Sequence, residues 1–171
     1  REMTELPLAL RDRLEEALPP ALTEVDQKSA DDGQTTKWLF ALHDGGRVET
    51  VLMKYPDRAT VCVSTQAGCA MACQFCATGQ GGFTRHLSEG EIVEQVVVAV
   101  RGARPRLVSN VVFMGMGEPL ANYERVWSAV CRLHDELGFS ARHLTVSTVG
   151  VVPGIRRLTT ASLPVNLAVS L

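Results

Sequence analysis

Three cysteines crowd into one short segment, and their spacing is the strongest chemical signal in the sequence. Cys69, Cys73 and Cys76 follow the pattern Cys-x3-Cys-x2-Cys, with Phe75 directly before the third cysteine. A structural zinc ion takes four protein ligands, and so does a four-iron cluster held entirely by cysteines. Three thiolates that share one metal centre therefore leave one metal position open, where a small molecule can bind and react.

Two other interpretations of this segment stay open. Cys62 or His86 could complete a zinc knuckle, because zinc accepts either sulfur or nitrogen as its fourth ligand. The thiols could also be buried without a metal, since free cysteine is among the most buried residue types. The spacing, with the aromatic residue just before the third cysteine, resembles the signature of radical S-adenosylmethionine enzymes, which implies an iron–sulfur cluster with the three cysteines as ligands.

A second group of chemically suggestive residues follows later predicted strands. The segment Gly115-Met-Gly-Glu-Pro119 ends one strand, and Ser147-Thr-Val-Gly150 ends the next. Glycine lets backbone amides approach a ligand closely, and Glu118 offers a carboxylate that can accept from an ammonium group or a ribose hydroxyl. A glycine-rich turn after a buried strand is common by itself, so its place after the cysteine segment gives this prediction its weight.

The elements that must position these residues alternate between strand and helix. Apolar residues at helical spacing occupy residues 4–22, and a turn at residues 43–46 joins two predicted hairpin strands. Ser88 and Glu91 form a capping box that begins a helix, with Gly102 as its expected end. Strands are expected at residues 37–42, 47–53, 59–64, 107–114, 143–147 and 164–171, and further helices at residues 121–137 and from Pro153.

This alternation predicts an α/β fold, a parallel sheet with helices outside. In such folds the ligand site gathers at the C-terminal ends of the strands. The cysteine segment and the two glycine-containing segments all follow strands, so we expect them to line one pocket.

The composition is that of an ordinary globular protein. The chain has 171 residues, 46% of them hydrophobic and 21% charged, which is enough for one core. Its apolar runs are too short for a membrane span, and no signal peptide is recognisable, so neither membrane insertion nor secretion is predicted. Five cysteines, three of them crowded, suit a reducing compartment, and we expect a cytoplasmic protein. A net charge of −2 gives no sign of nucleic-acid binding.

Both ends of the sequence predict a segment of a longer protein. Position 1 is Arg rather than Met, and Val165-Asn-Leu-Ala-Val-Ser-Leu171 is an apolar run that looks like an unfinished strand. A natural terminus seldom falls inside a buried strand, because the neighbouring strand would then lack part of its partner.

Taken in order, the motifs resemble those of the RlmN/Cfr family of radical S-adenosylmethionine (SAM) methyltransferases, which act on adenine in RNA. The matching segments run from about residue 37 to the end of the chain, and their order is highly specific. They are Cys62, Gly68-Cys-x3-Cys-x-Phe-Cys-Ala-Thr-Gly79, Gly82-Phe-Thr-Arg85, Leu87, Glu91-Ile92, Val112-Phe-Met-Gly-Met-Gly-Glu-Pro-Leu120, Ser147-Thr-Val-Gly-Val-Val-Pro153 and Leu167-Ala-Val-Ser-Leu171.

The resemblance implies a partial (β/α)6 barrel, preceded by a β-hairpin and the tail of a small helical accessory domain. Residues 1–36 would be that tail and a linker, and residues 37–171 would be the radical SAM core, broken off at about its fourth strand. The implied cofactors are a [4Fe-4S] cluster and SAM. The implied partners are 23S ribosomal RNA (rRNA), transfer RNA (tRNA) and an electron donor such as a flavodoxin system; no membrane is involved, and a monomer is expected.

The same resemblance implies roles for individual residues. Glu49 matches the family's proton acceptor, and Cys62 matches a cysteine that pairs transiently with a methyl-carrying cysteine outside this chain. The family's cluster ligands match Cys69, Cys73 and Cys76, and its SAM contacts match Gly117, Glu118, Ser147, Ser170 and Leu171.

The implied reaction is methylation of carbon 2 of adenine, a carbon too poor a nucleophile to attack SAM directly. In the family, one SAM methylates the cysteine that lies outside this chain. Another SAM yields a radical that removes hydrogen from that methyl group, and the resulting carbon radical adds to the ring. A base must then take the ring proton, and a thiolate must attack the sulfur to release the product. Glu49 and Cys62 match these two tasks.

Three alternatives remain. Within the family the methyl group could go to carbon 8 of adenine instead of carbon 2. The chain could also belong to a radical SAM enzyme of another reaction, such as an activase that installs a glycyl radical. A third alternative is an iron–sulfur electron-transfer or zinc-binding module without catalysis.

Overall fold

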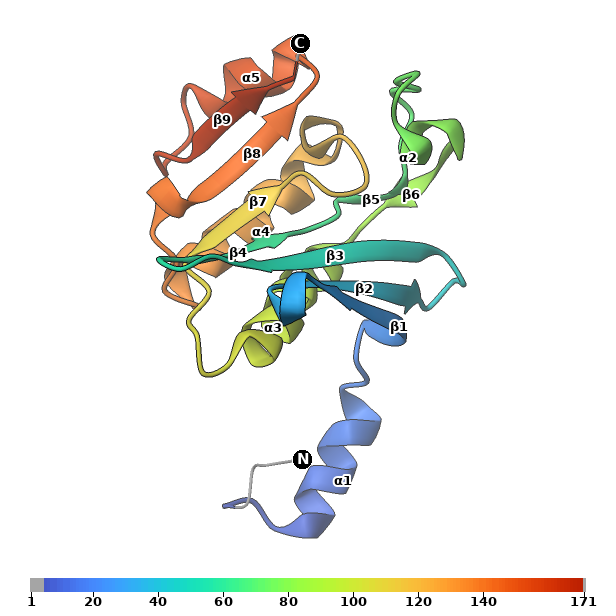
Figure 1. Cartoon of the computed structure of the whole chain (residues 1–171), viewed down its shortest axis with the longest axis vertical. Coiled ribbons are helices and arrows are strands. Elements are labelled where there is room, and N and C mark those ends of the chain that lie inside the picture. The colour runs from blue at the N-terminus through green and yellow to red at the C-terminus, as the bar shows by residue number, and fades with distance from the viewer. Residues whose placement is uncertain (1–4, 171) are drawn as a thin grey trace.

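A seven-stranded mixed sheet forms the centre of the computed structural model, which describes residues 5–170 (Figure 1). The strand order is β1-β2-β3-β4-β7-β8-β9, with β1 to β4 antiparallel and β4, β7, β8 and β9 parallel. The predicted hairpin and the predicted α/β class are confirmed, and the parallel half is consistent with a partial (β/α)6 barrel. The strands are β1 (Leu22–Ala30), β2 (Thr35–Leu42), β3 (Arg47–Lys54), β4 (Ala59–Cys62), β7 (Asn110–Phe113), β8 (Leu144–Thr148) and β9 (Asn166–Val169).

Alternating side chains give the sheet one buried face and one open face. On β3, Val48, Thr50 and Leu52 are fully buried, whereas Glu49 and Val51 are partly exposed. Helices α3 (Glu89–Ala103) and α4 (Tyr123–Asp135) each turn an apolar stripe toward the buried face. The stripes consist of Ile92, Val96, Ala99 and Ala103 on α3 and of Val126, Ala129, Val130 and Leu133 on α4.

Helix α3 begins as predicted but does not end as predicted. The Glu91 N–H donates to Ser88 Oγ at 3.2 Å, and the Ser88 N–H donates to the Glu91 carboxylate at 2.7 Å, which confirms the capping box. The end expected at Gly102 is wrong, because Gly102 lies inside the helix, where a Cβ would come within 2.9 Å of the Trp38 ring. Glycine here permits close packing of α3 against β2.

The N-terminal region departs most from the predicted elements. The helix expected over residues 4–22 is shorter, α1 (Leu8–Ala17); none of its residues is buried, and it lies apart from the sheet in Figure 1. Strand β1 was not expected, because only Leu22 among its nine residues is buried and no apolar alternation marks it. The domain division expected at residue 36 stays a prediction, although it falls at the start of β2, which pairs with β1.

Short elements complete the fold. The strand expected at residues 107–114 is shorter in the structure, where β7 begins at Asn110. Leu107, which precedes it, is 83% exposed. A 3-10 turn, Pro119–Asn122, precedes α4, and helix α5 (Val152–Leu158) packs against it where Gly154 approaches Leu120. The remaining elements are β5 (Gln66–Gly68), α2 (Ala77–Gln80), β6 (Phe83–His86) and the 3-10 turns Asp31–Gly33 and Ala141–His143. No helix within residues 5–170 is both long and apolar enough to cross a lipid bilayer.

Gln95 on α3 is the polar link between the helix layer and the sheet. Its side chain is fully buried, and its Oε1 accepts from Thr50 Oγ1 and from the Ser64 N–H, each at 2.8 Å. Its Nε2 donates to the Ser64 carbonyl at 3.0 Å. One amide therefore satisfies both backbone groups of Ser64, just beyond the end of β4.

Replacing Gln95 with Met should lower the free energy of unfolding by about 2–4 kcal/mol, because the Ser64 N–H and C=O would stay buried without partners. The two side chains have similar volumes, so a cavity adds little to this loss. Chemical denaturation of the variant and its parent measures the difference. The matched control is Gln34→Met at an exposed position, which should change stability by less than about 0.5 kcal/mol. Equal losses in both variants would contradict this role of Gln95.

Candidate functional site

The three cysteines predicted as ligands lie on an arm that leaves the sheet after β4. Strands β5 and β6 pair as a separate two-stranded antiparallel sheet, and α2 lies between them in the chain. In the cysteine loop, which runs from Cys69 to Cys76, the Cys69 N–H donates to the Gly82 carbonyl at 2.8 Å. The Cys76 N–H donates to the Cys73 carbonyl at 3.0 Å. A Cβ on Gly79 would lie 3.0 Å from the Cys73 nitrogen, so close backbone packing sets the shape of the loop.

The cysteine loop offers three thiols to a metal centre. Cys69 is buried, Cys73 and Cys76 are partly exposed, and all three are free thiols. The Gly79 N–H lowers the pKa of the Cys76 thiol, which favours the thiolate that metals bind. Among residues 5–170, no three His, Cys, Asp or Glu side chains converge closely enough to hold a single metal ion. Cysteine thiolates are the ligands of iron–sulfur clusters, so the chemistry of these three donors on one loop fits a cluster.

The two residues considered as a fourth zinc ligand are placed elsewhere. Cys62 is the last residue of β4 and belongs to the main sheet. His86 ends β6, with its Nδ1 3.0 Å from the Gln66 amide nitrogen, so Nδ1 accepts that hydrogen bond and the ring is neutral. Burial lowers the pKa of His86, and the positive charge of Arg125 adds to the effect. These positions give no support to a zinc knuckle.

Ser64, Thr65 and Gln66 form a polar crossover segment that leads from β4 into the arm. The Thr65 and Gln66 N–H groups both donate to the Met116 carbonyl, at 2.8 and 3.1 Å. Ser64 Oγ accepts from the Met116 N–H at 3.0 Å. Gln66 Oε1 accepts from the Glu118 N–H at 2.8 Å. The loop after β7 is therefore hydrogen-bonded to the segment that leads to the cysteines.

Asn122 supports the crossover segment from the other side. Its Nδ2 donates to the Thr65 and Leu87 carbonyls, both at 2.9 Å. Sequence reasoning singled out neither Asn122, nor Gln95, nor the crossover segment. The segment has one readable signal, a run of three polar residues directly after a buried strand, where unpaired polar groups would be costly. No comparable signal marks Asn122.

Close contact with the crossover segment requires glycine at positions 115 and 117. A Cβ on Gly115 would lie 2.7 Å from the Val63 carbonyl oxygen, and one on Gly117 would lie 2.5 Å from the Gln66 Cβ. Gly117 also has a φ of +101°, which residues with a side chain rarely adopt. We expected these glycines to admit a ligand. In the structure they bring two segments of the chain into contact.

The Glu118 carboxylate, expected to face a ligand, is only 2% exposed. Its Oε1 accepts from the Leu120 N–H and its Oε2 from the Val149 N–H, each at 2.9 Å. The side chain therefore caps the turn that begins at Pro119 and ties it to the end of β8. The SAM contact expected at Gly117 and Glu118 stays a prediction.

Glu49, Cys62 and Ser147 share the open face of the sheet. Cys62 pairs with Val51, so Glu49, two residues from Val51, points to the same side. Across β7, Cys62 lies level with Thr145, which places Ser147 on that side as well. Three residues far apart in the sequence are thus brought to one surface.

The other predicted SAM contacts lie where β8 and β9 end. Ser147 Oγ donates to the Phe113 carbonyl at 3.0 Å. The Ser170 N–H donates to the Thr148 carbonyl at 2.9 Å, so Ser170 continues the line of β9. Leu171 lies outside the described residues. The C-terminal ends of parallel strands meet at one edge of a sheet, so Ser147 and Ser170 lie at the edge from which the arm departs.

Glu49 and Cys62 differ in their surroundings. Burial raises the pKa of the Cys62 thiol, an effect that the Met114 N–H opposes. The resting form at neutral pH is therefore the thiol. Glu49 is half-exposed, and its Oε1 accepts from Lys37 Nζ at 2.8 Å. The open face thus carries a protonated sulfur beside an ion-paired carboxylate.

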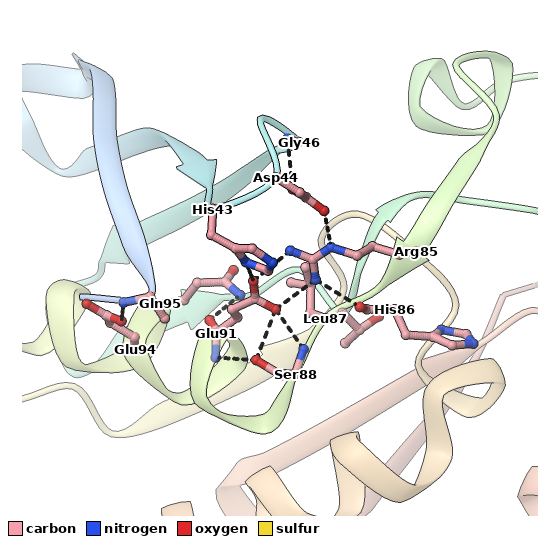
Figure 2. A network of polar contacts seen from close by, with 12 residues as sticks. His43, Asp44, Gly46, Arg85, His86, Leu87, Ser88, Glu91, Glu94 and Gln95 are labelled. Carbon is pink, nitrogen blue, oxygen red and sulfur yellow. Dashed lines mark hydrogen bonds and ion pairs between the residues drawn. The ribbon is translucent and has the colours of Figure 1, made fainter. Parts of the chain in front are cut away.

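An ion-pair network fixes the arm to the rest of the chain (Figure 2). Arg85 on β6 donates from Nη1 and Nη2 to the two Glu91 oxygens at 2.9 and 2.7 Å, and its Nε bonds to Asp44 in the β2–β3 turn. Glu91 is buried at the start of α3. The Arg85 guanidinium and the Gly46 N–H lower the pKa of Asp44 to about 2. The network joins the hairpin, the arm and α3 at one point.

Comparison with known proteins matches these features to one superfamily. Residues 63–170 match the Radical SAM superfamily. The chain is 58% identical over 183 residues to a "Probable dual-specificity RNA methyltransferase RlmN" of Salinispora tropica, with 99% of this chain and 49% of the relative covered. A protein of the same description from Chloroflexus aurantiacus is 58% identical over 180 residues, with 99% and 48% covered. The chain thus spans about half the length of these curated relatives.

A solved structure agrees with the same assignment. The crystal structure of a radical SAM methyltransferase from Sphaerobacter thermophilus superposes with a TM-score of 0.94 at 54% sequence identity. The match covers 99% of this chain and 51% of the other. The arrangement of strands, arm and helices is therefore shared with a chain about twice as long.

Replacing Gly117 with Ala should lower the free energy of unfolding by about 2–4 kcal/mol, because backbone strain and the clash with Gln66 add together. The matched control is Gly150→Ala, whose φ of +107° is similar but whose Cβ would meet nothing within 4 Å. That control should lose only the strain energy, about 1–2 kcal/mol. Urea unfolding of both variants measures the difference. If the two losses are equal, contact with the crossover segment does not require glycine.

Proposed function

This chain belongs to the radical SAM superfamily, and we propose that it forms the cluster-binding part of an enzyme that methylates carbon 2 of adenine in 23S rRNA and in some tRNAs. Membership of the superfamily implies a [4Fe-4S] cluster and SAM as cofactors. The RNA methyltransferase descriptions of the Salinispora and Chloroflexus relatives support RNA as the substrate. Carbon 2 is preferred over carbon 8 because housekeeping members of the RlmN/Cfr family act there.

One observation carries the proposal: the cysteine arm and the open face of the sheet meet at the same edge. Glu49 and Cys62 lie on neighbouring strands of that face, close to where β4 passes into the arm. A structural metal site or an electron-transfer module has no use for a carboxylate and a further thiol beside it. A reaction that needs both a base and a nucleophilic sulfur would use both groups.

Each residue then has one task. Cys69, Cys73 and Cys76 would hold the cluster as thiolates. The bound cofactors supply the radical that activates the methyl group. Glu49 would accept the ring proton on a carboxylate oxygen. Cys62, as a thiolate, would attack the sulfur that joins enzyme and RNA and form a disulfide with it. The bond from that sulfur to the methylene carbon breaks, and its electron pair takes up a proton to complete the methyl group. The enzyme is proposed to act as a monomer with an electron donor such as a flavodoxin system.

Replacing Cys62 with Ala should trap the protein on its RNA, in an enzyme that carries this segment at the full length of its relatives. The earlier steps do not use this thiol, so SAM cleavage and addition to adenine should proceed. Release should fail, because no thiolate is left to attack the sulfur. After anaerobic reaction, a denaturing gel should show a shifted band that is sensitive to RNase.

Two controls separate release from packing and from cluster loss. Cys131→Ala makes the same change on α4 and should release product normally, whereas Cys73→Ala should lose iron and give neither adduct nor product. Because burial raises the pKa of Cys62, release by the unaltered enzyme should quicken as the pH rises and the thiolate fraction grows. Methylated product without adduct from Cys62→Ala would contradict the release role.

A further inference from the structure

Lys37 on β2 contacts the proposed proton acceptor directly. Its Nζ donates to Glu49 Oε1 at 2.8 Å. In the sheet, Lys37 pairs with Val51, and Val51 pairs with Cys62. Lys37, Val51 and Cys62 therefore lie in one row across the open face. Glu49 lies beside this row on the side of the arm, because its backbone carbonyl accepts from Ser64 Oγ at 2.6 Å.

We propose that Lys37 is a positioning residue for Glu49, which aims the second oxygen of the carboxylate at the RNA base. The inference rests on the proposed function, in which Glu49 takes the ring proton. An ion pair between side chains that are 45% and 43% exposed contributes little to folding, so stability does not account for it. A role for Lys37 in orienting a catalytic carboxylate on the neighbouring strand does account for the ion pair.

The charges around Glu49 support this assignment. Lys37 comes from β2, Arg47 shares the open face on β3, and Cys62 is the ionisable group on β4. Within residues 5–170, Lys37 is the one cation at ion-pair distance from Glu49. Its hydrogen bond is therefore the contact that sets the direction of the carboxylate.

The proposed step transfers one proton. The bond between the ring carbon and its hydrogen breaks, the proton moves to a Glu49 oxygen, and the electron pair stays with the ring. Oε1 is bonded to Lys37, so Oε2 is the oxygen free to face the ring. A hydrogen bond from a strand-anchored lysine restricts rotation of the carboxylate, and orientation of this kind governs proton-transfer rates.

The test compares Lys37→Met, Lys37→Arg and Glu49→Gln in an enzyme with the full length of the relatives. Lys37→Met should cleave SAM at the parent rate but form methylated RNA about ten- to a hundredfold more slowly, with the covalent RNA adduct persisting. Lys37→Arg should restore most of the rate. The matched control is Lys54→Met at the far end of β3, which should behave like the parent.

The outcomes distinguish this inference from the proposed function. If Glu49→Gln accumulates adduct while Lys37→Met turns over normally, the positioning role is overturned and the function of Glu49 stands. If Glu49→Gln itself makes product at the parent rate, both are overturned. A raised KM for RNA with unchanged kcat in Lys37→Met would also overturn the inference, because it would make Lys37 an RNA contact.

Discussion

The backbone between β4 and the cysteine arm must leave the sheet through the protein interior, and satisfying its polar groups is the constraint on which the site depends. The side-chain amides of Gln95 and Asn122 bond to this crossover segment, and the Met116 carbonyl accepts two of its N–H groups. Any lost partner would leave a buried polar group without water. The same bonds draw residues 115–118 onto the crossover so closely that only glycine fits at two positions. The places of the arm, of the loop after β7 and of α3 follow from this one segment.

The two faces of the sheet have different roles, one in stability and the other in the proposed chemistry. One face is apolar and is covered by α3 and α4, so it holds the fold together. The other face is open, and the period of two along each strand puts Glu49, Cys62 and Ser147 there. Residues on a rigid sheet keep fixed positions relative to one another, which suits a reaction that uses a base and a thiolate in successive steps. The arm then brings its cysteines to the edge of that face.

Sequence patterns predicted the helices and strands whose position is determined by local periodicity or by a cap. Examples are the β2–β3 hairpin, the capping box of α3 and the alternation of strand and helix. They failed where a contact between distant segments determines the role of a residue. Gly102 looks like a helix end but is a packing position against Trp38. The capping of the Pro119 turn by Glu118 was not expected either, because a sequence does not show which backbone N–H groups will surround a carboxylate. The cysteine spacing is local and therefore readable, whereas the contacts that Gln66 makes with distant segments are not.

The affinity of a cluster-loaded Gln66→Leu variant for SAM tests most directly whether the crossover segment holds the parts of the cofactor site together. Leucine removes both the acceptor for the Glu118 N–H and the donor to His86 while roughly keeping the volume. Iron content should stay at the parent level, because the cysteines are untouched. SAM binding should weaken about tenfold, the equivalent of about 1.4 kcal/mol. Full iron content with unchanged SAM affinity would contradict the account.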